Sequence, residues 1–210
     1  MLRWTIRYED LNICRDTSWW TASLSIRWRE TGGGAHEAHM HAAIALAHET
    51  HMRAAIALAQ SSVTKGNHPF GAVLVLDGEI VCEAENTVHS DHDPTRHAES
   101  NLCSIANTQL SVAQRKQATL YTSTEPCPMC SGAIYWSSIG KVVFACPAIV
   151  LGEISGEELA VPCRTILSSG ILHSVEVVGP VLEEAAASMH REFWPTYTGG
   201  GAAPACDDAK

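Results

Sequence analysis

From Pro69 onward, short apolar runs alternate with longer segments whose apolar positions recur at helical spacing. Gly71–Leu76 is a continuous apolar run, and the turn dipeptide Asp77-Gly78 separates it from a second predicted strand at 80–84, which completes a hairpin. Further strands are predicted at 119–123, 141–145 and 175–178, and helices at 97–107, 128–138, 163–169 and 182–193. This order predicts an α/β sandwich, in which a mixed sheet opens with an antiparallel hairpin and carries helices on both faces.

A twelve-residue segment occurs twice before the first predicted strand, since residues 36–47 recur at 48–59 with two substitutions. Both copies are rich in strong helix formers. Twelve residues at about 100° each leave the apolar stripe of the second copy about 120° around a shared helix from that of the first, so one straight helix cannot bury both. We therefore expect the first copy to be exposed or to find another partner. The second copy should pack on the domain through Met52, Ala55, Ile56 and Ala59.

Length and composition indicate one domain with two appendages. The 210 residues are 46% hydrophobic and 18% charged, which fits one globular core. Residues 1–35 are predicted to be a poorly ordered extension, because they lack a sustained helical or strand period. The domain is predicted to span 36–195, with 36–47 dispensable, and 196–210 should form a flexible tail.

Charge and cysteine usage limit the partners and the compartment. The formal net charge of −9 disfavours nucleic acid, which is usually held by a basic surface. No stretch approaches the roughly 20 apolar residues that a membrane span needs, so we expect no membrane partner. Eight cysteines without an apolar signal segment favour a reducing, cytoplasmic location.

Two short motifs carry the candidate chemistry. His97-Ala98-Glu99 and, about thirty residues later, Pro126–Cys130 supply one imidazole, two thiolates and one additional carboxylate. Three protein ligands leave one tetrahedral position of a zinc ion open for water, whereas a structural zinc site normally has four nitrogen or sulfur ligands. The spacing therefore predicts one catalytic Zn²⁺ per chain, held by His97, Cys127 and Cys130.

Both motifs are expected at the first turns of helices, where unpaired N–H groups and the helix dipole stabilise thiolates. Zinc lowers the pKa of a bound water from about 16 to about 7. Glu99 should have no stable partner other than that water. We therefore assign Glu99 to take a proton from that water, to protonate a ring nitrogen of the substrate, and then to protonate the departing ammonia.

These residues resemble the zinc-dependent cytidine/deoxycytidylate deaminase superfamily, whose signature pairs H-x-E with P-C-x-x-C. The similarity covers about 51–195 and is closest to guanine deaminases and tRNA adenosine deaminases. It rests on residues 69–73, 85–86, 93–99 and 120–134. The resemblance implies a cytidine-deaminase-like three-layer α/β/α sandwich with a five-stranded mixed sheet, a homodimer, and hydrolytic removal of ammonia from a base.

The resemblance also implies substrate-binding residues. Asn86 matches an asparagine that hydrogen-bonds the base or sugar, and Phe70 matches a residue beside the pocket, although a turn residue and core packing are the alternatives. Ala98, between the ligand and the carboxylate, is expected to contact substrate. Glu158 is a candidate for a carboxylate that closes over a guanine edge, but with Glu157 it equally fits a solvated helix start.

The remaining polar groups are expected to have structural roles. Glu125 should fix the loop that carries the cysteines, and Cys82, Cys103 and Cys146 should be small core residues. We expect hydrogen-bonded surface histidines near the mouth of the site. These are His68, His89 and His92.

The leading functional prediction is deamination of a free nucleobase or nucleoside, with a purine such as guanine or guanosine favoured. Two alternatives keep the chemistry and change the substrate: cytosine, or adenosine in tRNA, which should require a basic surface near the mouth. A non-enzymatic alternative is a zinc-stabilised interaction module. The unligated Glu99 argues against it, because a structural zinc site needs no such carboxylate.

Overall fold

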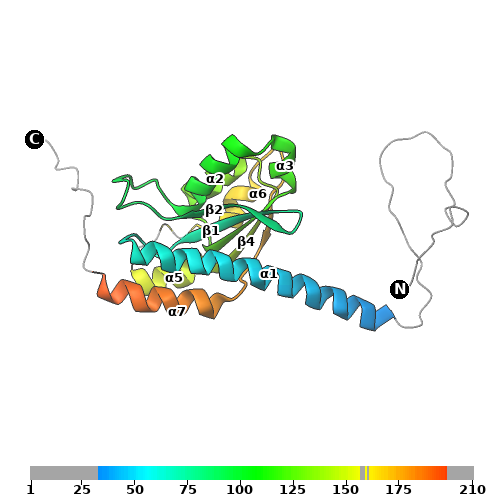
Figure 1. Cartoon of the computed structure of the whole chain (residues 1–210), viewed down its shortest axis with the longest axis horizontal. Helices are drawn as coiled ribbons and strands as arrows, with labels where there is room; N and C mark the ends of the chain where they lie inside the picture. Colours follow the sequence, from blue (N-terminus) through cyan, green and yellow to red (C-terminus); the bar gives the residue numbers. More distant parts are fainter. Residues whose placement is uncertain (1–32, 157–158, 160, 198–210) are drawn as a thin grey trace, which may run out of the picture. The chain divides into compact units, whose positions relative to one another are not determined.

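The computed structural model describes residues 33–156, 159 and 161–197. Within these residues one sheet forms the middle layer (Figure 1), in the order β2-β1-β3-β4-β5. β1 pairs antiparallel with β2 and β3, whereas β3, β4 and β5 run parallel. The predicted mixed sheet with an opening hairpin is therefore confirmed. Its strands are β1 (Gly71–Leu76), β2 (Glu79–Glu85), β3 (Thr119–Thr124), β4 (Lys141–Cys146) and β5 (Glu176–Val178).

Helices follow the strands in the predicted order, with two additions. The helices are α1 (Gly33–Thr64), α2 (Ala98–Gln109), α3 (Val112–Gln117), α4 (Pro128–Trp136), α5 (Ala148–Ser155), α6 (Cys163–Ser168) and α7 (Glu183–Phe193), with a 3₁₀ turn η2 (Trp194–Thr196). The sequence analysis did not predict α3 and α5, because six and eight residues are too short to show a helical period. A capping box between Ser111 and Gln114 begins α3.

Alternate residues of the central strands face two separate cores. Leu120 of β3 belongs to the core shared with α2, α4 and α6, whereas the adjacent Tyr121 belongs to the core shared with α1, α5 and α7. Figure 1 shows α1, α5 and α7 together on one side of the sheet. The period of two along each strand therefore produces the expected three-layer α/β/α sandwich.

The duplicated segment forms part of one continuous helix, α1. In its second copy Met52, Ala55 and Ala59 are fully buried and Ile56 is 8% exposed, while residues 37–47 of the first copy are exposed. The helical phase argument is therefore confirmed. No helix among the described residues has the length and hydropathy needed to cross a membrane.

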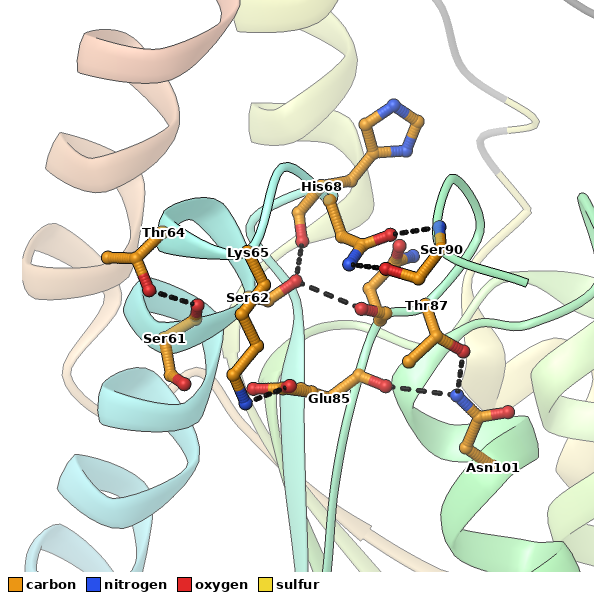
Figure 2. Close-up of polar contacts among 11 residues, drawn as sticks. Ser61, Ser62, Thr64, Lys65, His68, Glu85, Thr87, Ser90 and Asn101 are labelled. Atoms are coloured by element: carbon orange, nitrogen blue, oxygen red, sulfur yellow. Dashed lines mark hydrogen bonds and ion pairs between the residues drawn. The ribbon is translucent and has the colours of Figure 1, made fainter. Parts of the chain in front are cut away.

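Two close contacts join the end of α1 to the segments that lead to the site. A Cβ at Gly71 would lie 2.4 Å from the carbonyl oxygen of Ala55, so only glycine lets α1 approach β1 this closely. The buried Ser62 hydroxyl lies 2.6 Å from the His68 carbonyl oxygen and 3.1 Å from that of Asn86 (Figure 2). These contacts fix the backbone on both sides of Phe70.

Some predictions concern residues that the structure does not describe. The predicted N-terminal extension lies outside the described residues except for its last three positions, and the predicted tail does so from residue 198. Glu157 and Glu158 also lie outside the described part of the chain, so a substrate contact by Glu158 stays a prediction.

Candidate active site

The two motifs meet at the beginnings of two helices. His97 is the N-cap of α2 and Cys127 is the N-cap of α4, each in an extended backbone conformation. Pro128 occupies the first turn of α4, where its missing N–H costs nothing. Candidate donor atoms of His97, Cys127 and Cys130 all lie within 4.8 Å of one another. These residues form the candidate zinc site that the spacing predicts.

The donor set fits a zinc ion. The Cys127 sulfur lies 3.7 Å from Nδ1 of His97. Tetrahedral zinc, with Zn–S near 2.3 Å and Zn–N near 2.0–2.1 Å, separates such ligands by about 3.6 Å. One imidazole and two thiols are also the ligand types that zinc prefers in proteins.

The surroundings of the thiols favour one thiolate. The Cys130 thiol donates to the Cys127 sulfur, and this hydrogen bond, aided by His97, lowers the pKa of Cys127 well below its ordinary value. The same donation, together with burial, raises the pKa of Cys130. The hydroxyl of Ser100 on α2 lies 3.5 Å from the Cys130 sulfur and links the two motif helices.

Glu99 lies in the first turn of α2 and is only 4% exposed. The expectation that its carboxylate has no protein partner is wrong, because the Thr122 hydroxyl donates to Oε1 at 2.7 Å. Burial raises the pKa of Glu99 above its ordinary value, and the hydrogen bond from Thr122 partly opposes that shift. The site therefore holds a desolvated, oriented carboxylate two residues from a candidate metal ligand.

Glu125 fixes the loop before the cysteines, as expected. Its Oε2 accepts the N–H of Ala148 at 3.0 Å, and its Oε1 accepts the N–H of Cys163 at 2.9 Å. Ala148 and Cys163 are the first residues of α5 and α6, whose N-caps are prolines without a side-chain acceptor. One carboxylate thus caps two helices, a role that the anion preference of helix N-termini explains.

The family model described as "Cytidine and deoxycytidylate deaminase zinc-binding region" matches residues 37–146, just over half of the chain. This match includes all three candidate metal ligands and Glu99. The chain belongs to the cytidine and deoxycytidylate deaminase family.

Relatives of this chain are named for several different substrates. A probable cytosine deaminase of Schizosaccharomyces pombe is 40% identical over 142 residues, which are 64% of this chain and 85% of the relative. A tRNA-specific adenosine deaminase of Bacillus subtilis is 37% identical over 132 residues, covering 62% and 78%. A guanine deaminase of Bacillus subtilis is 49% identical over 77 residues, covering 37% of this chain and 49% of the relative.

The fold agrees with the family. The solved structure of a guanine deaminase from Nitrosomonas europaea superposes with a TM-score of 0.61 and 23% identity, over 69% of this chain and 82% of that one. The cytidine-deaminase-like sandwich expected from the resemblance is therefore confirmed.

Asn86 and Phe70, the first two predicted substrate-binding residues, are neighbours, since the Asn86 N–H donates to the Phe70 carbonyl oxygen at 2.9 Å. Asn86 is 1% exposed; its Oδ1 accepts the N–H of Val88 at 3.1 Å, while its buried Nδ2 has no hydrogen-bond partner. Oδ1 of Asn86 therefore serves the turn, and Nδ2 is left for the predicted substrate contact. The Phe70 ring lies parallel to that of His97, at 7° and 6.5 Å between centroids, and also packs against both cores.

Ala98 is fully buried and contributes its side chain to the core beneath α2. A substrate contact through Ala98 stays a prediction.

A buried polar chain that no sequence pattern indicated joins η2 and α7 to β3. Trp194 donates from Nε1 to Nδ1 of His190 at 3.2 Å, and His190 Nε2 lies 2.8 Å from the Thr124 hydroxyl. Because an indole N–H only donates, Nδ1 of His190 must accept, and its proton lies on Nε2, which donates to Thr124. Burial lowers the pKa of His190 to about 4, so the ring is neutral at neutral pH.

Proposed function

We propose that this chain is a zinc-dependent hydrolytic deaminase of a free nucleobase or nucleoside, with a purine of the guanine or guanosine type favoured. The observation that carries the proposal is the buried Glu99 carboxylate beside a three-donor metal set. A structural zinc site gains nothing from an unligated acid, whereas hydrolytic deamination requires a proton carrier at that position.

Each side chain has a role in the proposed reaction. Zinc, when bound by His97, Cys127 and Cys130, supplies a Lewis acid that makes water nucleophilic near neutral pH. Glu99 takes one proton from the attacking water and delivers it to a ring nitrogen of the base. It then takes the second proton from the hydroxyl of the tetrahedral adduct and delivers it to the amino group, which leaves as ammonia. Thr122 orients the Glu99 carboxylate through its hydroxyl.

Substrate recognition is proposed for Asn86 and Phe70. The buried Nδ2 of Asn86 can donate to a carbonyl oxygen of the base, which would satisfy a polar group that otherwise has no partner. Phe70 offers an aromatic face next to His97 for a planar ring. Both roles suit a free base or a nucleoside.

The choice of a purine rests on similarity to guanine deaminases. Two other relatives support alternative substrates. The S. pombe relative is named a probable cytosine deaminase and is matched over 85% of its length, which favours cytosine as the second candidate. A relative named a tRNA-specific adenosine deaminase favours tRNA, but the net charge of −9 opposes a polyanionic substrate.

A homodimer is part of the proposal. Trp136 at the end of α4 is 75% exposed, and Ile171 and Leu172 are 95% and 70% exposed. All three lie beside Tyr135, whose ring packs edge-on against Trp136 and whose hydroxyl accepts the Leu172 N–H. Large apolar side chains gathered in this way suit a subunit interface.

Sedimentation of the parent chain as a dimer and of Trp136→Ser as a monomer would support this assignment, and a monomeric parent chain would contradict it.

The decisive experiment measures ammonia release from guanine, guanosine, adenine, adenosine, cytosine and cytidine, each with and without a metal chelator. We expect the highest kcat/KM for guanine or guanosine and loss of activity after chelation. Activity on cytosine alone would replace the purine assignment with the cytosine alternative. No release from any of the six compounds or from a tRNA anticodon hairpin, by folded and zinc-loaded protein, would favour the interaction module instead.

A further inference from the structure

Three polar atoms from distant segments converge beside the candidate active site. Nε2 of His68, in the loop after α1, lies 3.1 Å from Nε2 of His89, in the loop after β2. The hydroxyl of Tyr197, just after η2, lies 3.2 Å from the His68 nitrogen and 2.9 Å from the His89 nitrogen. The three donor atoms therefore form a nearly equilateral triangle.

Simple two-centre hydrogen bonds account for only two sides of this triangle. The ring nitrogen of an imidazole either carries a proton and donates or has a lone pair and accepts, and it does not do both. The Tyr197 hydroxyl can donate to one histidine and accept from the other, which explains two sides. On the third side, the two imidazole nitrogens lie 3.1 Å apart, and no further proton is available for a hydrogen bond between them.

A metal ion that lies above the plane of the triangle, equally far from the three atoms, accounts for every side. Around a first-row transition metal with ligands at about 2.0–2.1 Å, neighbouring ligand atoms lie about 3.3–3.4 Å apart in a tetrahedron and about 2.8–3.0 Å apart in an octahedron. The observed separations of 2.9–3.2 Å lie within the range that these two geometries span together. Two imidazoles and a phenol oxygen are ligands that such ions accept.

The surrounding structure holds the two histidines in place. Oδ1 of the buried Asn67 accepts the backbone N–H groups of His89 and Ser90, each at 3.0 Å, and its Nδ2 donates to the Ser90 hydroxyl at 2.7 Å. The Ser62 hydroxyl lies against the carbonyl of His68 (Figure 2). Burial, followed by repulsion from His89 and His97, lowers the pKa of His68 to about 4. A neutral imidazole is the form that binds a metal.

We propose that His68, His89 and Tyr197 form a second metal site, which binds one divalent first-row transition ion. It is distinct from the His97, Cys127 and Cys130 set, from which it is separated by the Phe70 ring; the centroid of that ring lies 6.5 Å from those of His68 and His97. The bound ion joins the loop after β2 to the end of the described chain at Tyr197. This site does not depend on the proposed deaminase activity.

The test counts zinc ions in purified full-length protein after equilibration with excess Zn²⁺ and desalting. We expect two ions per chain in the parent. The Cys127→Ser variant should retain one ion, held by the second site. Tyr197→Phe keeps the ring that stacks on Phe193 at 5.2 Å but removes the oxygen. Tyr197→Phe should weaken zinc binding at the second site at least about tenfold in a titration against a coloured zinc chelator. Even residues that only hydrogen-bond to metal ligands contribute about 10–100-fold in affinity.

His89→Gln should remove the second ion and leave the first. The matched control is His92→Asn, in the same exposed loop, where asparagine suits the positive φ of 51°. This control should keep both ions. With Cu²⁺ as the probe, the parent should show a visible tyrosinate-to-copper absorption band that Tyr197→Phe lacks.

Circular dichroism of each variant separates loss of the ion from loss of the fold. One zinc per chain in the parent, with none in Cys127→Ser, would overturn the proposal. So would folded His89→Gln and Tyr197→Phe proteins that titrate like the parent. Either result would mean that the three groups only form hydrogen bonds with one another. Absence of deaminase activity would leave the zinc counts unchanged.

Discussion

The Thr122 hydroxyl on β3 donates to the Glu99 carboxylate on α2 at 2.7 Å, and both side chains are buried. The bond joins the sheet to the helix whose N-cap is a metal ligand. A carboxylate with one oxygen held in this way has its orientation restricted. The sheet therefore positions the group to which proton transfer is assigned.

Removing the Thr122 hydroxyl should slow the reaction without weakening substrate binding. Thr122→Val has nearly the same shape but cannot donate, so Glu99 loses its orientation. We expect kcat to fall about 10–100-fold, since small misplacements of a catalytic group have effects of this size, while KM and zinc content change little. Thr122→Ser, which keeps the hydroxyl, should restore most of the rate. A Val variant with the parent kcat would show that the bond is only structural.

Glu99→Gln should keep the fold and the metal but abolish measurable ammonia release. General acid and base transfer contributes typically about 10²–10⁴-fold, and an amide can neither take up nor release the proton. Zinc content by elemental analysis and steady-state release of ammonia measure the two properties separately. Glu99→Ala serves as a second variant. Release at the parent rate by either variant would remove Glu99 from the mechanism.

Much of the fold follows from short-range patterns. Apolar runs and the Asp77-Gly78 turn identified every strand, and the helical phase of the duplicated segment identified Met52 and Ala59 as core residues. The same patterns missed α5, which has eight residues after Pro147 and gains its capping acceptor from Glu125, twenty-three positions earlier. Such a contact exists only after folding, so no local pattern contains it.

The candidate metal ligands were predictable because their types and spacing carry the chemistry directly. Thr122 was not predicted, although the alternation of side chains along β3 could have indicated its position. Leu120 and Thr122 share one face of the strand, and Leu120 packs in the core beneath α2, the helix that carries Glu99. The sequence placed His68 and His89 near the mouth of the site, but nothing in it indicated that Tyr197 joins them, because segments distant in sequence meet only in the folded chain.

His190 should make stability fall in acid. In the folded chain burial lowers its pKa to about 4, whereas in the unfolded chain it is near 6.5, so the unfolded state binds the extra proton between these values. Its contribution is therefore complete above about pH 6.5 and is lost as the pH falls toward 4, by about 3 kcal/mol in total. Protonation of Nδ1 would also oppose the N–H of Trp194.

The measurement compares urea unfolding of the parent and His190→Gln between pH 4 and 7.5. Glutamine can accept from Trp194 and donate to Thr124 but does not titrate. The difference in unfolding free energy between the two proteins should thus shrink or reverse as the pH falls, while acid effects on other groups cancel. A difference that is constant across this range would contradict the assignment.

The duplication provides a matched pair of substitutions. Met40 and Met52 occupy equivalent positions in the two copies, but Met40 is 57% exposed and Met52 is fully buried. Met52→Ala should lower the free energy of unfolding by about 2–5 kcal/mol, because it leaves a cavity under α1. Met40→Ala should change it by less than about 0.5 kcal/mol. Equal costs in urea unfolding would mean that the first copy also packs against protein.

Deletion of residues 1–47 should leave zinc binding, folding and ammonia release nearly unchanged. The deletion retains His48, whose Nδ1 lies 2.9 Å from the hydroxyl of Tyr121, and the buried stripe from Met52 to Ala59. A deletion of residues 1–59 is the matched comparison, since it removes that stripe and exposes the core face of β1 and β3. Thermal unfolding followed by circular dichroism should show a cooperative transition for the shorter deletion and none for the longer one. Loss of the transition in both would place the first copy inside the folding unit, since its removal alone would then be enough to unfold the chain.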